Sequence, residues 1–186
     1  MSLEVKTIEI PEVLFLRTGV FSDGRGQFSE SYNAANFKPW LGPHVFFVQD
    51  NQTYSKQGVL RGLHYQTERT QGKLLRVLRG TIFDVVVDLR RSSSTFGRWH
   101  GVELSAPDRW QIWIPPGLAH GFLAMSKATE VLYKVTDYWH PKSEQTLRWN
   151  DLHLQIGWPL PADGPRPILS VKDSAGLAWE DAPKFE

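Results

Sequence analysis

Residues 58–66 and 115–122 hold the side chains best suited to proton transfer or metal binding, because each segment contains one histidine, His64 or His120. Strand alternation would separate the first segment into two faces unless a bulge intervenes. One face would carry Leu60, Gly62, His64 and Gln66, and the other Arg61, Leu63 and Tyr65. Two histidines and the neutral amide of Gln66 form a poor ligand set for a transition metal.

Both segments resemble the two signature motifs of the cupin superfamily. In those motifs a glycine followed six residues later by histidine, and a Pro-x-Gly-x-x-His sequence, contribute metal ligands. Gly58 and His64 match the first, and residues 115–120 match the second. The first motif requires another histidine two residues on, where this chain has Gln66. The resemblance therefore implies a cupin shape without its metal, and we predict no metal and no cofactor.

A fuller resemblance emerges from motifs read in order along the chain. The chain is similar to the dTDP-4-dehydrorhamnose 3,5-epimerase family over residues 15–173. The shared motifs are residues 21–30 (FSDGRGQFSE), 48–51 (VQDN), 58–66 (GVLRGLHYQ), 95–97 (TFG), 115–122 (PPGLAHGF), 133–134 (YK), 137–139 (DYW) and 169–173 (LSVKD). Each motif alone is weak evidence, whereas their order and spacing together are specific.

This resemblance implies a cofactor-independent reaction on a 4-keto-6-deoxy sugar carried by thymidine diphosphate (dTDP). Inversion at C3 and C5 requires a base, an acid across the ring and a donor at the enolate oxygen. By similarity, the base is His64, oriented by Asp173. Lys73 would stabilise the enolate oxygen, and Tyr133 would donate the proton from the opposite face.

The resemblance also implies a set of substrate-binding residues. Arg25 and Arg61 match anion-binding positions, where a guanidinium group suits phosphate oxygens. Trp139 occupies a position where family members often have tyrosine, and it could stack on thymine. The other expected contacts are Glu30, Gln49, Asp50, Asn51, His120, Glu144 and Lys172.

Pattern alone favours simpler roles for several of these residues. Tyr133 alternates with Val131 and Val135, which is typical of a core aromatic, and Lys73 opens a strand, where a solvated lysine is usual. We expect Asp84 and Asp88 to be structural.

Short β-branched and aromatic runs, separated by Gly, Pro, Asn and Asp, must position these groups. The expected strands are residues 45–48, 74–78, 81–89, 101–104, 111–114 and 130–136, with hairpin turns at 79–80 and 106–108. Only residues 33–37 suggest a helical turn. The pattern predicts an all-β, cupin-like jelly-roll β-sandwich with few short helices, forming one domain over residues 1–186. Four prolines between Trp158 and Ile168 predict an extended C-terminal segment that returns to the body near residue 173.

Composition narrows the class of protein. Lys and Arg number 21 against 20 Asp and Glu, a net charge of +1, which argues against nucleic-acid binding. The absence of cysteine excludes disulfides, thiolate nucleophiles and cysteine-based metal sites. Neither a secretory signal nor a membrane-spanning run is visible, so we expect a soluble, cytoplasmic protein with no membrane partner. The family and the open sheet edges imply a homodimer.

Four other functions compete with the 3,5-epimerase. An enzyme inverting only C3 or only C5 would use the same base and acid. A sugar-nucleotide ketoisomerase of this fold is a second rival. A metal-dependent cupin oxygenase is a third, although Gln66 argues against it. The last is a non-catalytic sugar-binding jelly roll, which would need no His–Asp–Lys–Tyr set.

Overall fold

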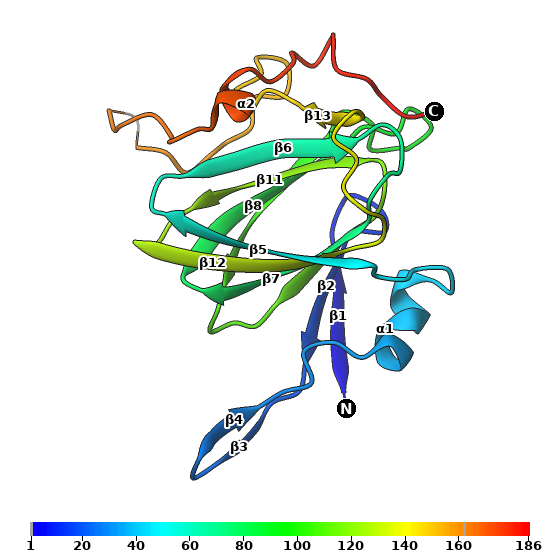
Figure 1. Ribbon diagram of the computed structural model, residues 1–186, viewed down its shortest axis with the longest axis vertical. Helices are drawn as coiled ribbons and strands as arrows, with labels where there is room; N and C mark the ends of the chain where they lie inside the picture. The colour runs from blue at the N-terminus through cyan, green and yellow to red at the C-terminus, as the bar shows by residue number, and fades with distance from the viewer. Residues whose placement is uncertain (1, 162) are drawn as a thin grey trace.

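The computed structural model describes residues 2–161 and 163–186. Its main body is a sandwich of two antiparallel sheets (Figure 1), which confirms the predicted all-β class. The strands are β1 (Leu3–Thr7), β2 (Leu14–Thr18), β3 (Phe21–Asp23), β4 (Gly26–Phe28), β5 (Gln49–Lys56), β6 (Leu60–Gln66), β7 (Lys73–Arg79), β8 (Thr81–Asp88), β9 (Trp99–Ser105), β10 (Gln111–Ile114), β11 (Leu118–Ala124), β12 (Ala128–Val135) and β13 (Glu144–Thr146).

One sheet has the strand order β1-β2-β10-β7-β12-β5, and the other has β13-β6-β11-β8-β9. Strands that follow one another in sequence often belong to different sheets. The turn between β7 and β8 at Gly80 and the turn between β9 and β10 at residues 106–108 both pass from one sheet to the other. The two expected hairpins are therefore wrong, because these turns close the sandwich instead of pairing adjacent strands.

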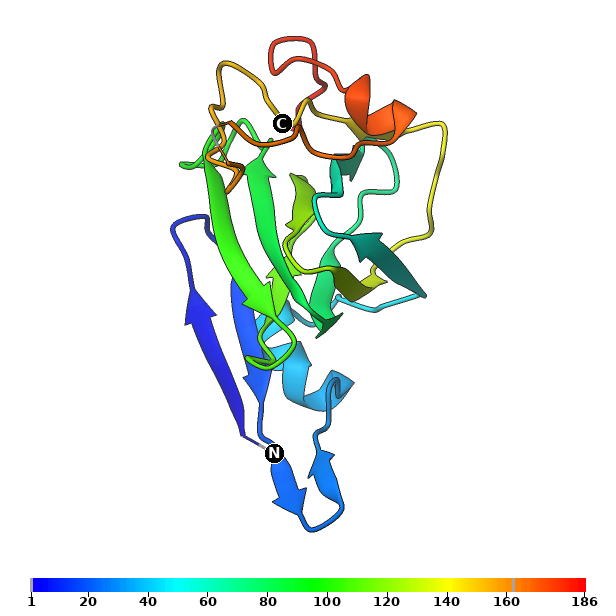
Figure 2. The ribbon, with the colours of Figure 1, turned by 90° about the vertical axis from the view of Figure 1, so that its left-hand side faces the viewer.

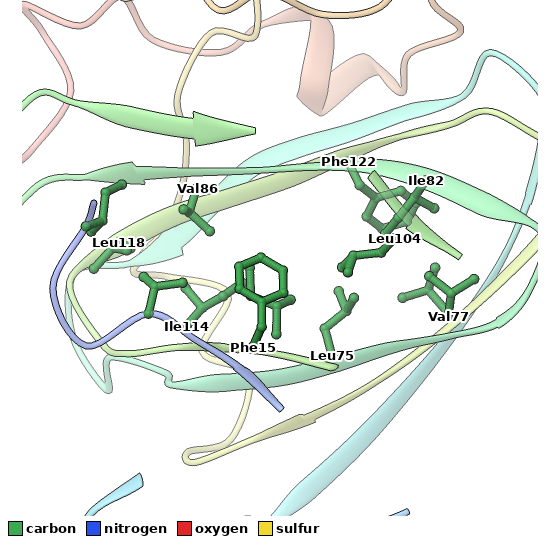
Figure 3. Close-up of a cluster of buried hydrophobic side chains, with 13 residues drawn as sticks. Phe15, Leu75, Val77, Ile82, Val86, Leu104, Ile114, Leu118 and Phe122 are labelled. Atoms are coloured by element: carbon green, nitrogen blue, oxygen red, sulfur yellow. The ribbon is translucent and has the colours of Figure 1, made fainter. Parts of the chain in front are cut away.

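Strand alternation builds the core between the sheets. From the six-stranded sheet, Phe15, Leu75 and Ile114 point inward, and Val86 and Phe122 meet them from the other sheet (Figure 3). All five side chains are at most 8% exposed. This apolar packing occupies only part of the space between the sheets, and polar side chains line the remainder.

Two short helices occur in the described residues, α1 (Ala34–Leu41) and α2 (Val171–Ser174). Asn33 caps α1 by accepting hydrogen bonds from the backbone N–H groups of Ala35 and Asn36, so the expected helical turn at 33–37 begins a two-turn helix. No helix in this part of the chain is long and apolar enough to cross a membrane.

The apolar run at residues 45–48, expected as a strand, is irregular. Val45 and Phe47 pack with Phe37 of α1 on the outer face of the six-stranded sheet. Pairing with β12 begins at Gln49. The run therefore reflects packing against a helix and not a sheet ladder.

The C-terminal segment returns over the five-stranded sheet, as expected (Figure 1). Isolated bridges join Val59 to Ile168 and Leu147 to Leu177. Trp179 packs with Leu63 on the outer face of β6. These contacts place α2 beside β6.

Candidate active site

A cavity of about 370 Å³ lies between the sheets, a volume suited to a small-molecule ligand. Residues of β5, β6, β7, β11, β12, β13 and α2 line it, together with two loop residues. They are Gln49, Asn51, Thr53, Arg61, His64, Tyr65, Gln66, Gln71, Lys73, His120, Gly121, Phe122, Tyr133, Trp139, Glu144 and Lys172. A larger hollow of about 800 Å³ lies beside β1, but no histidine, lysine or tyrosine is among its lining residues.

A bulge in β6 puts Arg61 and His64 on the same wall of this cavity. His120 pairs with His64 and Phe122 pairs with Arg61, so three steps along β6 oppose two along β11. Gly62 permits this geometry, since a Cβ there would lie 2.6 Å from the Cα of Gly121. Simple alternation would place Arg61 opposite His64, but the bulge, which the sequence analysis allowed as an exception, brings the two residues to one side.

His64 is held by Asp173, as the resemblance implies. Its Nε2 lies 2.5 Å from Asp173 Oδ1, and the Ser170 hydroxyl donates to Asp173 Oδ2 at 2.7 Å. Burial lowers the pKa of His64 below its ordinary value, although the hydrogen bond to Asp173 opposes the shift. With Nε2 directed at the carboxylate, Nδ1 of a neutral imidazole is free to accept a proton.

Lys73 reaches into the cavity from β7, in the opposite sheet. Its ammonium donates to the backbone carbonyl of His64 at 3.1 Å, and its side chain is almost fully buried. Burial lowers the pKa of Lys73 to about 8, with Glu144 and Asp84 opposing the shift. At pH 7 the group is therefore mainly a cation, and it is not the solvated lysine that pattern alone suggested.

Tyr133 faces the cavity from β12, so Tyr133 and His64 lie on opposite sheets. It also packs against the edge of the apolar core, which accounts for its alternation with Val131 and Val135. Burial raises the pKa of Tyr133, and the phenol therefore keeps its proton at neutral pH.

His120 forms a second His–Asp pair that the sequence analysis missed. Its Nε2 lies 2.8 Å from Asp84 Oδ2, and Asp84 is fully buried. The sequence predicts a structural Asp84, whereas the structure shows that it fixes the orientation of an imidazole that lines the cavity. Its alternation with Ile82 and Val86, which are core residues, was the signal, because a carboxylate on an apolar face needs a partner.

Arg61 is the guanidinium group on the cavity wall. It donates to the Ser55 hydroxyl at 3.0 Å and to the backbone carbonyl of Tyr54 at 3.2 Å. Gln49 and Asn51 come from the same face of β5 and are joined by a 2.8 Å hydrogen bond. These neutral contacts leave the charge of Arg61 without an acidic partner among the described residues.

Trp139, Glu144 and Lys172 complete the wall. Lys172 donates to Glu144 Oε1 at 2.8 Å. Burial alone would raise the pKa of Glu144, but the bond from Lys172 lowers it overall. Trp139 remains 57% exposed, with a large aromatic face open to solvent.

Three expected binding residues lie outside the cavity. Asp50 alternates to the outer face of β5 and pairs with Lys134 at 3.0 Å, which corrects its assignment. Glu30 accepts a hydrogen bond from Asn36 at 2.9 Å. Arg25 lies in the exposed β3–β4 hairpin, paired with Asp23 at 2.7 Å. Within a single chain, the motif that contains Arg25 and Glu30 therefore does not contribute to the cavity that the other motifs line.

No three His, Asp or Glu side chains of the described residues come together in a group that could hold a metal ion. The amide of Gln66, at the position of the missing cupin histidine, is already engaged with backbone groups. That the protein needs neither a metal nor a cofactor stays a prediction.

Comparison with known proteins gives a consistent result. Residues 7–181 match the family model of dTDP-4-dehydrorhamnose 3,5-epimerase. The chain is 50% identical, over 98% of its length, to the dTDP-4-dehydrorhamnose 3,5-epimerases of Neisseria gonorrhoeae and of Pseudomonas aeruginosa. The match covers 54% of the Neisseria protein and 99% of the Pseudomonas protein. The chain thus spans about half the length of the first of these relatives. The dTDP-6-deoxy-D-glucose-3,5-epimerase of Legionella pneumophila, solved in complex with dTDP-4-keto-L-rhamnose, superposes with a TM-score of 0.93 at 43% identity, with full coverage of both chains.

Proposed function

The chain belongs to the dTDP-4-dehydrorhamnose 3,5-epimerase family, and from this premise we propose that it converts dTDP-4-dehydro-6-deoxy-D-glucose to dTDP-4-dehydro-L-rhamnose. As a member of this family it is an isomerase. The observation that carries the proposal is the placement of His64 and Tyr133 on opposite sheets that line one cavity. Lys73 lies on the same sheet as Tyr133, and its ammonium reaches the backbone carbonyl of His64. Inversion at a carbon needs this arrangement, because the proton leaves one face and returns to the other.

Each inversion proceeds through an enolate. Nδ1 of His64 removes the proton from the carbon next to the C4 ketone, and the electron pair of the broken C–H bond moves through the new C=C bond to the C4 oxygen. The Lys73 ammonium stabilises the negative oxygen. The Tyr133 hydroxyl then protonates the carbon on its other face; afterwards solvent takes the extra proton from His64 and returns one to Tyr133. The same groups serve C3 and C5, since both carbons adjoin the ketone.

We assign the dTDP group to the outer part of the cavity. Arg61 and Lys172 supply the positive charge that a diphosphate requires, and Trp139 offers an exposed aromatic face for thymine. Gln49, Asn51, His120 and Glu144 supply donors and acceptors for the sugar and ribose hydroxyls.

The decisive experiment follows both carbons in one reaction. The protein is incubated with dTDP-4-keto-6-deoxyglucose in deuterated water, and the product is analysed by NMR. Deuterium and inversion at both C3 and C5 support the 3,5-epimerase. Label at one carbon alone would instead establish an enzyme that inverts only that carbon, and no label at all would reject epimerisation.

Tyr133→Phe should separate proton removal from inversion. The substitution deletes the donor on the far face but leaves His64 and Lys73 in place. We expect deuterium exchange to survive while net inversion is lost at one or both carbons, as measured by NMR. An equal loss of exchange and inversion would contradict the donor role and would indicate that Tyr133 positions the sugar ring.

We further propose a homodimer in which the β3–β4 hairpin completes the site of the other copy. Both views show the hairpin extending away from the sandwich (Figures 1 and 2). Its aromatic side chains Phe21 and Phe28 are 57% and 64% exposed, as is usual for a surface that another chain covers. Arg25 and Glu30, expected to bind substrate but outside the cavity of their own chain, would then enter the partner's cavity.

Mixing two defective variants tests this arrangement. Arg25→Ala should weaken substrate binding about tenfold or more, the usual cost of a lost charged hydrogen bond. When Arg25→Ala is refolded with His64→Ala and assayed well below KM, where both variants turn over slowly, each mixed dimer would contain one intact site, so about a quarter of the parent activity should return. Sedimentation gives the assembly state. Activity no greater than the sum of the two separate variants would show that Arg25 does not act across a dimer.

A further inference from the structure

The segment that carries Trp139, residues 137–140, lies in the connection between β12 and β13 and has no regular secondary structure. Because the Trp139 side chain is largely exposed, core packing does not fix its orientation. A flat stacking surface helps binding only if it is already in place, since ordering a loop on binding reduces affinity. The position of Trp139 must therefore depend on what holds its backbone.

Three glutamine side chains hold that backbone at four consecutive residues. Gln71 Nε2 donates to the carbonyl of Asp137 at 2.8 Å. Gln66 Nε2 donates to the carbonyl of Tyr138 at 3.3 Å, and Gln66 Oε1 accepts from the N–H of His140 at 2.9 Å. Gln49 Oε1 accepts from the N–H of Trp139 at 3.3 Å.

Gln66 is the central member of this set. It contacts the backbone on both sides of Trp139, and it also donates to the carbonyl of Arg69 at 2.7 Å, which ties residues 137–140 to the loop after β6. It is 4% exposed, so these bonds form away from competing water. Only an amide can donate to two carbonyls and accept from an N–H at this position; a carboxylate lacks the donor.

We propose that Gln66 is a positioning residue that orients Trp139 for a nucleobase. This inference rests on the proposed function, because the ligand of Trp139 is the thymine of dTDP. The cupin motif has a metal-ligating histidine at this position, and here the amide instead builds part of a nucleotide subsite. The three hydrogen bonds of the Gln66 amide all go to backbone groups, so its loss should affect base binding and leave the chemical step intact.

Two probes separate the base from the phosphates: dTDP and inorganic pyrophosphate, each titrated by calorimetry. Gln66→Met removes all three bonds without adding charge, and we expect it to weaken dTDP about tenfold while leaving pyrophosphate within twofold. Trp139→Ala should give the same pattern. With saturating substrate, kcat of Gln66→Met should stay within about threefold of the parent, and KM should rise with the loss of dTDP affinity.

Gln111→Met is the matched control. Gln111 is 5% exposed and donates to the carbonyl of Ser31 at 2.7 Å, on the outer face of the six-stranded sheet. It should leave both affinities unchanged. If Gln66→Met does not fold, Gln66→Ala removes the same bonds without adding charge and leaves room for water to satisfy the freed backbone groups, and should also weaken dTDP selectively.

Unchanged dTDP affinity in these Gln66 variants, or an equal loss of dTDP and pyrophosphate, would overturn the positioning role. A parent protein that neither binds dTDP nor exchanges substrate protons would instead reject the proposed function, so the two failures are distinguishable.

Discussion

Replacing His64 by alanine is expected to slow deuterium exchange at both C3 and C5 by about 100- to 10,000-fold, the usual contribution of a positioned base. The same group serves both carbons, so the two rates should fall together. Affinity for dTDP should change little, because the base acts on the sugar and not on the nucleotide. NMR of exchange and calorimetry with dTDP measure the two effects separately.

A control distinguishes loss of the base from loss of the fold. His44 is exposed in the loop after α1, and His44→Ala should leave exchange unchanged. Asp173→Asn should lower exchange in the same direction as His64→Ala, because the carboxylate orients the imidazole and stabilises its protonated form. Exchange in His64→Ala within tenfold of the parent would show that another residue is the base.

Lys73→Met is expected to lower turnover by about 100- to 1,000-fold, the usual cost of removing one donor from a developing oxyanion. The methionine has nearly the same length and suits a buried position, so the loss reports the charge more than the packing. Thermal unfolding of the variant checks this point, because a buried ammonium costs stability and Lys73→Met should not lower the melting temperature. A variant with near-parental turnover would contradict the role of Lys73 at the enolate oxygen.

The pH dependence of the activity tests the roles of Lys73 and His64 independently of substitution. Lys73 acts in its protonated form, and its pKa is about 8, so activity should fall as pH rises through about 8. His64 acts in its neutral form, and burial lowers its pKa below 6.5. On the acidic side, activity should therefore fall only when the pH drops below 6.5 and His64 becomes protonated. Lys73→Arg should move the alkaline limb beyond the measurable range, because a guanidinium stays charged.

The sequence by itself determined the class of fold, the family and the identity of the central catalytic candidates. Alternating apolar residues specify strands because successive side chains point to opposite faces, and that signal is local. The spacing of His64 and His120 within their motifs is equally local. The return of Asp173 to His64 is a long-range contact, and the family motif at residues 169–173 was enough to predict it.

The tertiary structure alone decided how strands and side chains were combined. The turn at Gly80 could have been a hairpin or a crossing, since both need the same residues, and pairing partners elsewhere in the chain settled it. The bulge that puts Arg61 on the same wall as His64 requires the close approach of Gly62 to Gly121 on a neighbouring strand. The pairing of Asp84 with His120 likewise needs two strands in register.

The same limit explains the residues that the structure left apart. Arg25 and Glu30 belong to the family motif, but a motif records only that residues occur together in a family and not which copy of the chain uses them. Asp50 was assigned to the site with its neighbours Gln49 and Asn51, and the strand start at Gln49 turned it to the opposite face. Residue types and local periodicity can be read directly from the sequence. The face that a side chain occupies, the register of strand pairing and the sheet that a strand joins depend instead on the free energy of packing between segments that are distant in sequence.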